Sequence, residues 1–172
     1  MSTSFYDLTV GTYLRTATAV AGILQKGAAP FAAEGIDPVE VVATRLYPDM
    51  ANFHFQVTSV THHSIGADRG FESGEFRPPR YDDCDYAALQ AMTTETLEAL
   101  QSKSRDEIDA LAEGKVVFKM GSTKIPFTAQ NFALSFSLPN FYFHATTAYD
   151  ILRMKGVKLG KMDFLGAMAA GA

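Results

Sequence analysis

Histidine is the residue of this chain best suited to chemistry, and two of the four histidines, His63 and His144, lie on different predicted long helices. Two helices that pack in a bundle can direct their histidines at one interior point, which is how metal sites in helical bundles are built. Neutral imidazole is a good ligand for zinc, nickel or iron. The sequence therefore predicts an interior site formed by this pair.

The difficulty for a metal site is the third protein ligand, because a catalytic zinc ion usually has three of them and one water. A helix that supplies two ligands places them four residues apart, and from His144 these positions are Asn140 and Ala148, neither of which is a good ligand. The chain contains neither an H-E-x-x-H nor an E-x-x-H motif. The alternative is that His144 is a core histidine held by a neighbouring side chain or carbonyl. His54 and His62 are expected at the surface or rim.

Other kinds of chemistry have little support in the sequence. The one cysteine, Cys84, lies among Asp82, Asp83 and Asp85, whose charges should raise its pKa and leave an inert thiol. The chain has no nucleophile elbow, phosphate loop or dinucleotide-binding fingerprint. A net charge of −4 with scattered Lys and Arg argues against nucleic-acid binding. Without a signal-peptide pattern or an uninterrupted apolar run of about 18 residues, we expect a cytoplasmic protein with no membrane span.

The helix that must position His144 is predicted over residues 128–153, and the rest of the chain is organised around it. The Phe-Tyr-Phe triplet at residues 141–143 points in directions about 100° apart and covers most of the helix circumference. A helix that is apolar nearly all round belongs in the centre of a bundle or in the seam of a dimer. Pro139 is expected to bend it, because proline lacks an amide donor and clashes with the preceding turn.

The remaining elements follow from hydrophobic periodicity, which predicts three more long helices and two short ones, at residues 6–33, 50–71, 86–102, 39–44 and 104–113. Alternating apolar residues around a Gly-Ser turn predict a β-hairpin at residues 115–127. Residues 72–85 are expected to form an irregular loop, and the tail, residues 157–172, an extended segment. We therefore predict one domain of residues 1–172 with an all-α fold: a four-helix bundle with short connecting helices and one small β-hairpin before the last helix.

Several sequence blocks have the specificity of family motifs. They are YDLTV near the start, L-x-PDM at residues 46–50, FKMGS at 118–122, LPNFYFHATTAYDILR at 138–153 and G-V-x-LGK-x-DFLG at 156–166. Together with His63, they resemble an uncharacterised bacterial family, a domain of unknown function grouped with the DinB/YfiT-like metalloenzymes. The resemblance covers nearly the whole chain and implies a DinB-like four-helix bundle, often dimeric.

The resemblance also implies a kind of site. Better-known members of that superfamily bind a divalent metal through three histidines, one from the second helix and two from an HxxxH pair on the last helix. By position, His63 matches the second-helix ligand and His144 one of the pair, which leaves Asn140 or Ala148 at the remaining position. Members include thiol transferases and a maleylpyruvate isomerase.

Two functions are consistent with these observations. The first is a DinB-like homodimer whose interior pocket, lined by His63, Asn140 and His144, binds a small ligand. The second is a divalent-metal enzyme, a thiol transferase or a related transferase or isomerase, with Zn, Ni or Fe held by His63 and His144 and by water, Asn140 or a substrate atom.

Overall fold

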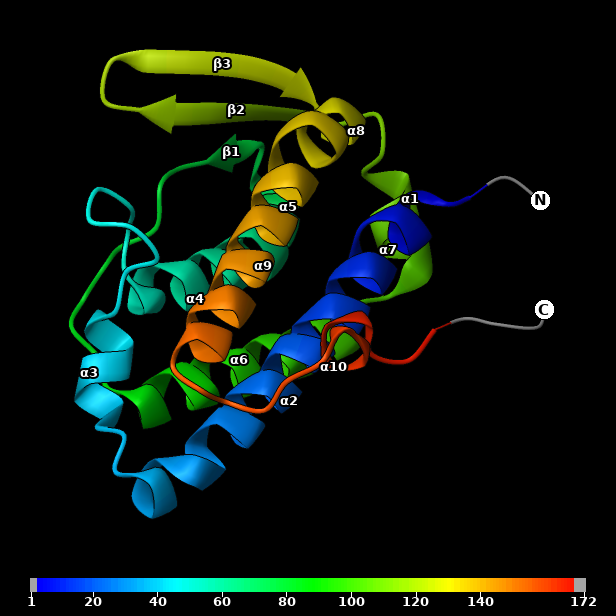
Figure 1. The fold of residues 1–172 in the computed structure, drawn as a ribbon. Helices are drawn as coiled ribbons and strands as arrows, with labels where there is room; N and C mark the ends of the chain where they lie inside the picture. Colours follow the sequence, from blue (N-terminus) through cyan, green and yellow to red (C-terminus); the bar gives the residue numbers. More distant parts are fainter. Residues whose placement is uncertain (1–2, 169–172) are drawn as a thin grey trace.

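Four long helical segments make up most of the computed structural model, which describes residues 3–168 (Figure 1). Two of them are α2 (Val10–Glu34), preceded by α1 (Phe5–Leu8), and α6 (Tyr86–Gln101). The second segment joins α4 (Phe53–Thr61), η1 (His62–Gly66) and α5 (Ala67–Ser73), and the last joins α8 (Ala129–Phe132), η2 (Ala133–Ser137) and α9 (Leu138–Met154). The short helices are α3 (Pro38–Ala43), α7 (Arg105–Ala110) and α10 (Lys161–Leu165). The predicted long helices and both short connecting helices are confirmed.

The helices begin where the sequence offers caps. Asp37, Asp85 and Thr128 each accept a hydrogen bond from a backbone N–H in the first turn of α3, α6 and α8. Such caps satisfy amide donors that have no partner within the helix. The second long segment begins later than predicted, at Phe53, because Asn52 caps it, accepting from a backbone N–H at 3.1 Å.

Each long segment packs against two others: α4 lies against α9 and α6, and α2 lies against α6 and α9 (Figure 1). Burial of large apolar side chains between them is the main stabilising term. The largest of these fully buried side chains are Tyr13, Leu24, Phe53, Leu89, Leu100, Ile108, Phe132, Phe141, Ile151 and Leu152. Within residues 3–168, the structure contains no helix that is both long and apolar enough to cross a membrane.

A small mixed sheet lies at the end of the molecule where α8 begins (Figure 1). β2 (Lys115–Met120) and β3 (Thr123–Thr128) form the predicted antiparallel hairpin, and β1 (Glu75–Phe76) pairs in parallel with β2. The expectation of a wholly irregular loop at residues 72–85 is therefore wrong. Two residues are too few to show an alternating pattern, and β1 forms because β2 has a free edge and because Phe76 is buried against Phe118.

Two π-helical turns, η1 and η2, interrupt the second and the last long segments. In η2 the N–H of Leu138 donates to the carbonyl of Ala133, five residues earlier. Pro139 follows as the second residue of α9, a position where a helix tolerates a residue without an N–H. The irregularity of this helix is thus a π-helical turn before Pro139, whereas the sequence placed it at Pro139 itself.

A buried chain of hydrogen bonds connects both π turns to α2. Ser137 Oγ, in η2, donates to the backbone carbonyl of His63, in η1, at 2.7 Å. The Tyr13 hydroxyl lies 2.9 Å from the same Oγ and must donate to it, because the proton of Ser137 is already used. Tyr13 and Ser137 are fully buried, and the Tyr13 ring packs edge-on against Phe141. Three segments distant in sequence are therefore joined at one interior point.

The last helix is not enclosed on every side, so the first of its two predicted places, the centre of a bundle, does not hold, and the seam of a dimer stays a prediction. Phe141 is fully buried, but 37% of Tyr142 and 55% of Phe143 are exposed, and so is 52% of Leu134 in the preceding π turn. α9 packs against α4 and α2, which cover one part of its circumference and leave the aromatic face open.

The C-terminal tail contains a helix, which corrects the expectation that it is extended. α10 packs against α2, where Lys26 forms an ion pair with Asp163. The same carboxylate accepts a hydrogen bond from the N–H of Gly160 at 2.8 Å, which caps α10. Residues 169–172, which belong to the same predicted tail, lie outside the described part of the chain.

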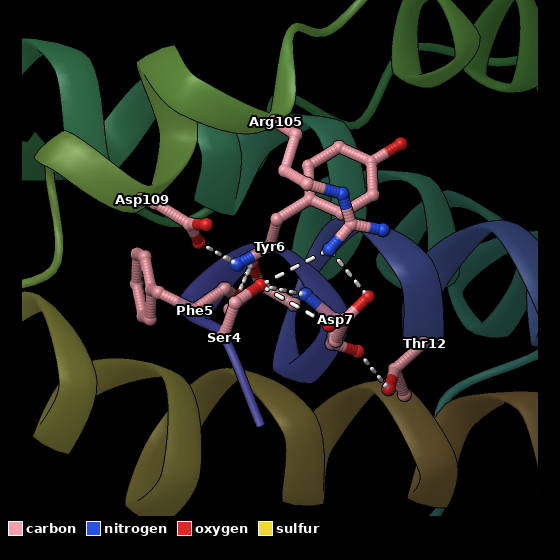
Figure 2. A network of polar contacts seen from close by, with 8 residues as sticks. Ser4, Phe5, Tyr6, Asp7, Thr12, Arg105 and Asp109 are labelled. Atoms are coloured by element: carbon pink, nitrogen blue, oxygen red, sulfur yellow. Dashed lines mark hydrogen bonds and ion pairs between the residues drawn. The ribbon is translucent and has the colours of Figure 1, made fainter. Parts of the chain in front are cut away.

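Polar contacts attach α1 to α7 (Figure 2). Arg105 pairs with Asp7 at 2.7 Å, and its guanidinium lies 4.5 Å from the centre of the Tyr6 ring. The hydrogen bond from Arg105 lowers the pKa of Asp7, and the N–H of Tyr6 donates to Asp109 at 2.6 Å. Because Asp7 and Arg105 are both exposed to solvent, this network orients the N-terminal turn and adds little to stability.

Ser137→Ala should destabilise the protein more than Tyr13→Phe. The alanine leaves the His63 carbonyl and the Tyr13 hydroxyl buried without a partner, whereas the phenylalanine removes only one hydrogen bond. We expect losses of about 2–4 and about 1 kcal/mol in the free energy of unfolding. Urea denaturation followed by circular dichroism measures both, and equal losses would contradict the proposed chain.

Candidate functional site

The structure places His63 and His144 together in the interior, between η1 and α9. Their ring centres are 5.9 Å apart and their planes are 17° from parallel. Only 7% of His63 and 9% of His144 are exposed. The bond from Ser137 to the His63 carbonyl holds η1 against the last long segment and so brings the two rings together.

His144 has one nitrogen held and one free for a ligand. Its Nδ1 lies 2.8 Å from Oε1 of Gln56, and the amide of Gln56 is oriented by a hydrogen bond from its Nε2 to the carbonyl of Ala51 at 2.9 Å. An amide oxygen only accepts, so Nδ1 of His144 carries the proton and Nε2 keeps its lone pair. At Nδ1, His144 is therefore the core histidine of the alternative prediction, held by a neighbouring side chain.

Gln56 is only 1% exposed on α4 and is not among the residues that the sequence pointed to. Its signal in the sequence is a glutamine seven residues before His63, in a helix that also buries other polar residues such as His54 and Thr58. That position gives no indication of the partner, because Gln56 and His144 meet only through the packing of α4 on α9.

His63 is held by its backbone rather than by its ring. Its Nδ1 is buried and has no hydrogen-bond partner among the described residues. A buried polar atom without a partner costs free energy, so it needs a physical explanation such as a bound group. The unpartnered Nδ1 of His63 is the clearest indication that the pair binds another group and does not only fill the core.

Burial keeps both rings neutral at pH 7. It lowers the pKa of His63 to about 3, with smaller contributions from His62 and His144, and it lowers the pKa of His144 to about 4. The environment is aromatic, which explains the desolvation. The phenylalanine rings within 5.2–5.7 Å of the pair, measured between ring centres, are Phe55, Phe76, Phe136 and Phe143.

The other predicted ligand position does not complete a metal site. Asn140 is half-buried, and its Nδ2 donates to the carbonyl of Phe136 at 2.7 Å, which leaves only its Oδ1 as a potential ligand atom. Among residues 3–168, no group of three or more His, Cys, Asp or Glu side chains is arranged to hold a metal ion. Two imidazoles are therefore the nitrogen donors among the predicted residues, whereas a catalytic zinc site usually has three protein ligands.

The pair lines neither the cleft beside η1 and α6 nor the cleft between α2 and α10. Instead it lies under the open face of α9, because Phe143 packs edge-on against His144 and is itself 55% exposed. The exposed aromatic face and the histidine pair are thus adjacent.

Of the two histidines expected at the surface or rim, His62 lies at a rim, whereas His54 does not. His54 is not at the surface but 96% buried, since only 4% of it is exposed; its Nε2 lies 3.1 Å from Cys84 Sγ and its ring stacks on Tyr81. His62 is half-buried, and its Nε2 donates to the carbonyl of Arg77 at 2.6 Å. The predicted rise in the pKa of Cys84 is confirmed, with burial as the first cause and the neighbouring aspartates as the second.

This arrangement of helices is that of a DinB-type protein. It is similar to the crystal structure, at 1.83 Å resolution, of a DinB family member protein from Shewanella denitrificans, with a TM-score of 0.78 and 30% sequence identity over 97% of this chain and 94% of that chain. The chain belongs to the DUF1993 family, a domain of unknown function whose profile matches residues 5–165. No curated protein matches the chain. The resemblance inferred from the sequence motifs is thereby confirmed.

Acid should destabilise the protein through this pair. In the unfolded chain both imidazoles take up protons near pH 6.5, but in the folded protein only near pH 3–4. The contribution of the two neutral histidines to stability is therefore fully present above about pH 6.5. It is lost as the pH falls towards the folded pKa values, by about 2 kcal/mol for each histidine between pH 7.5 and 5.0.

The test is urea denaturation at both pH values in the presence of EDTA. His63→Phe and His144→Phe should each remove about 2 kcal/mol of the pH dependence between pH 7.5 and 5.0, and His54 and His62, whose pKa values burial also lowers, contribute to what remains. If both variants lose as much stability between these pH values as the wild type does, the histidine pair is not the source of the pH dependence.

Proposed function

We propose that this protein is a DinB-like homodimer that binds a small ligand through His63 and His144. The observation that carries the proposal is the unpartnered Nδ1 of His63, buried beside a second neutral imidazole. A ligand that reaches this atom would replace the missing hydrogen bond and lower the free energy of the bound state.

The chemistry of the pair limits what it can bind. Both rings are neutral, and Gln56 leaves His144 with a free acceptor at Nε2, so the complementary ligand group is an N–H or O–H donor. The surrounding Phe side chains favour a ligand with an apolar or aromatic body. Asn140, four residues before His144, adds one carbonyl oxygen on the same helix face.

The open face of α9 supports the dimer. Leu134, Tyr142 and Phe143 expose large apolar surfaces on one helical segment, and apolar patches of this kind often mark contact sites. A twofold interface would bring the same face of a second copy against it and would cover the histidine pair from outside.

Phenol and its methyl ether, anisole, test the ligand site. We expect phenol to shift the NMR signals of the His63 and His144 rings in a saturable manner, because its hydroxyl can donate to them. Anisole has the same ring without the donor and should leave the signals unchanged. Absence of a phenol shift, or equal shifts with both compounds, would contradict the proposal.

Phe143→Glu tests the dimer. By light scattering at micromolar concentration, we expect the wild type to be a dimer and the variant a monomer, because the new charge would be buried in the interface. Val39→Glu is the matched control, since Val39 is 70% exposed on α3. A monomeric wild type would contradict the proposed dimer.

A divalent-metal enzyme is the second candidate, and one observation favours it. Metal-binding histidines usually donate their second ring nitrogen to a side-chain or backbone acceptor, as His144 does to Gln56. The two imidazoles would then hold Zn, Ni or Fe together with water, Asn140 Oδ1 or a substrate atom. Such a metal would supply Lewis-acid activation of a thiol or water, as expected of a thiol transferase or related enzyme.

Elemental analysis of protein purified without an affinity tag separates the two candidates. The ligand-binding proposal predicts substoichiometric metal and no binding of added Zn²⁺ that depends on both histidines. If the protein contains stoichiometric metal, and the double variant His63→Ala/His144→Ala does not, the metal enzyme is the better assignment and the ligand-binding proposal is wrong.

A further inference from the structure

A second site lies on the other side of the α4–η1–α5 segment from α9. It is a cleft of about 690 Å³ between this segment and α6, bounded on its third side by residues 75–80. That volume is within the range of small-molecule sites. Neither His63 nor His144 lines it, so it is independent of the function proposed above.

The cleft has an apolar floor and a cationic rim. Ile65, Phe76 and Met92 contribute to the floor. The charged side chains that line it are three arginines and two glutamates: Arg69, Arg77, Arg80, Glu75 and Glu95.

The arginines are not equally available. Glu75 already forms ion pairs with Arg77, at 3.2 Å, and with Lys119. Arg69 and Arg80 have no ion pair among residues 3–168. Two guanidinium groups thus remain available at the rim of one cleft, in a chain whose net charge is −4.

One buried polar atom in the wall also lacks a partner. Thr58 is 93% buried, since only 7% of it is exposed. Its hydroxyl makes no hydrogen bond within the described residues. Thr58 lines the cleft, so a polar group bound there could satisfy its hydroxyl.

The wall formed by residues 75–80 is held in place without a ligand. Nε2 of His62 donates to the carbonyl of Arg77 at 2.6 Å, and the ring of Phe76 packs on His62 with 4.4 Å between the ring centres. A Cβ at Gly66, in the same π turn, would lie 2.9 Å from Nδ1 of His62, so a larger residue would push this histidine away. The cleft is therefore largely preformed, which lowers the entropic cost of binding.

We infer that this cleft binds a small organic anion with an apolar body, whose carboxylate or phosphate head pairs with Arg69 and Arg80 while the body covers Ile65, Phe76 and Met92. Guanidinium groups bind both kinds of head group through paired, charge-assisted hydrogen bonds. The apolar floor excludes a bare inorganic ion as the best ligand, because such an ion would leave that surface in contact with water.

Titration calorimetry below the micelle concentration tests the inference with three amphiphiles of equal chain length. Dodecanoate or dodecyl phosphate should bind with 1:1 stoichiometry, and the better of the two identifies the head group. Dodecyltrimethylammonium, which carries the opposite charge, should bind at least about tenfold more weakly.

Arg69→Gln/Arg80→Gln should weaken binding of the preferred anion by about tenfold or more, because both guanidinium partners are lost. Arg15→Gln is the matched control, since Arg15 is an exposed arginine that lines the other cleft, between α2 and α10. The inference is wrong if neither anion binds, if the cation binds equally well, or if Arg15→Gln has the same effect as the double variant.

Discussion

The position of the histidine pair depends on one buried chain of hydrogen bonds, from Tyr13 to Ser137 and from Ser137 to the carbonyl of His63. Hydrogen bonds between fully buried groups cannot be exchanged for water, so breaking one leaves its partners unsatisfied. Both bonded positions in the second and last segments lie in π-helical turns, which are frequent at functional sites. The chain joins α2, η1 and η2 and thereby sets the separation of the two imidazoles.

The aromatic environment determines what the pair can do. It removes water from both rings, so His63 and His144 stay neutral and offer lone pairs rather than charge. Neutral imidazole suits either a hydrogen-bond donor or a metal ion, and the number of protein donors is what distinguishes the two. With Gln56 holding one ring and Asn140 bonded to its own helix, the described residues supply two nitrogen ligands, which favours a donor ligand over a tightly held metal.

The second long segment contributes to both proposed sites because adjacent residues on a helix point in different directions. His63 contacts the ring of His144, whereas His62 faces the opposite cleft and binds the carbonyl of Arg77. The ring of Phe76 packs on both histidines, so it forms the boundary between the two sites. A ligand in the cleft would therefore contact a side chain that also packs against the histidine pair.

Local signals in the sequence are enough to predict the long helices, the hairpin with its Gly-Ser turn, and the family through its motifs. The sequence also indicates His63 and His144 as candidates, because residue type and position on a predicted helix can both be read from it. Only tertiary packing sets the partner of His144, the π turns, the pairing of β1, the helix in the tail and the exposure of Phe143. The reason is physical: periodicity and capping depend on residues within one or two turns, whereas burial, desolvation and hydrogen-bond satisfaction depend on segments that meet only when the chain folds.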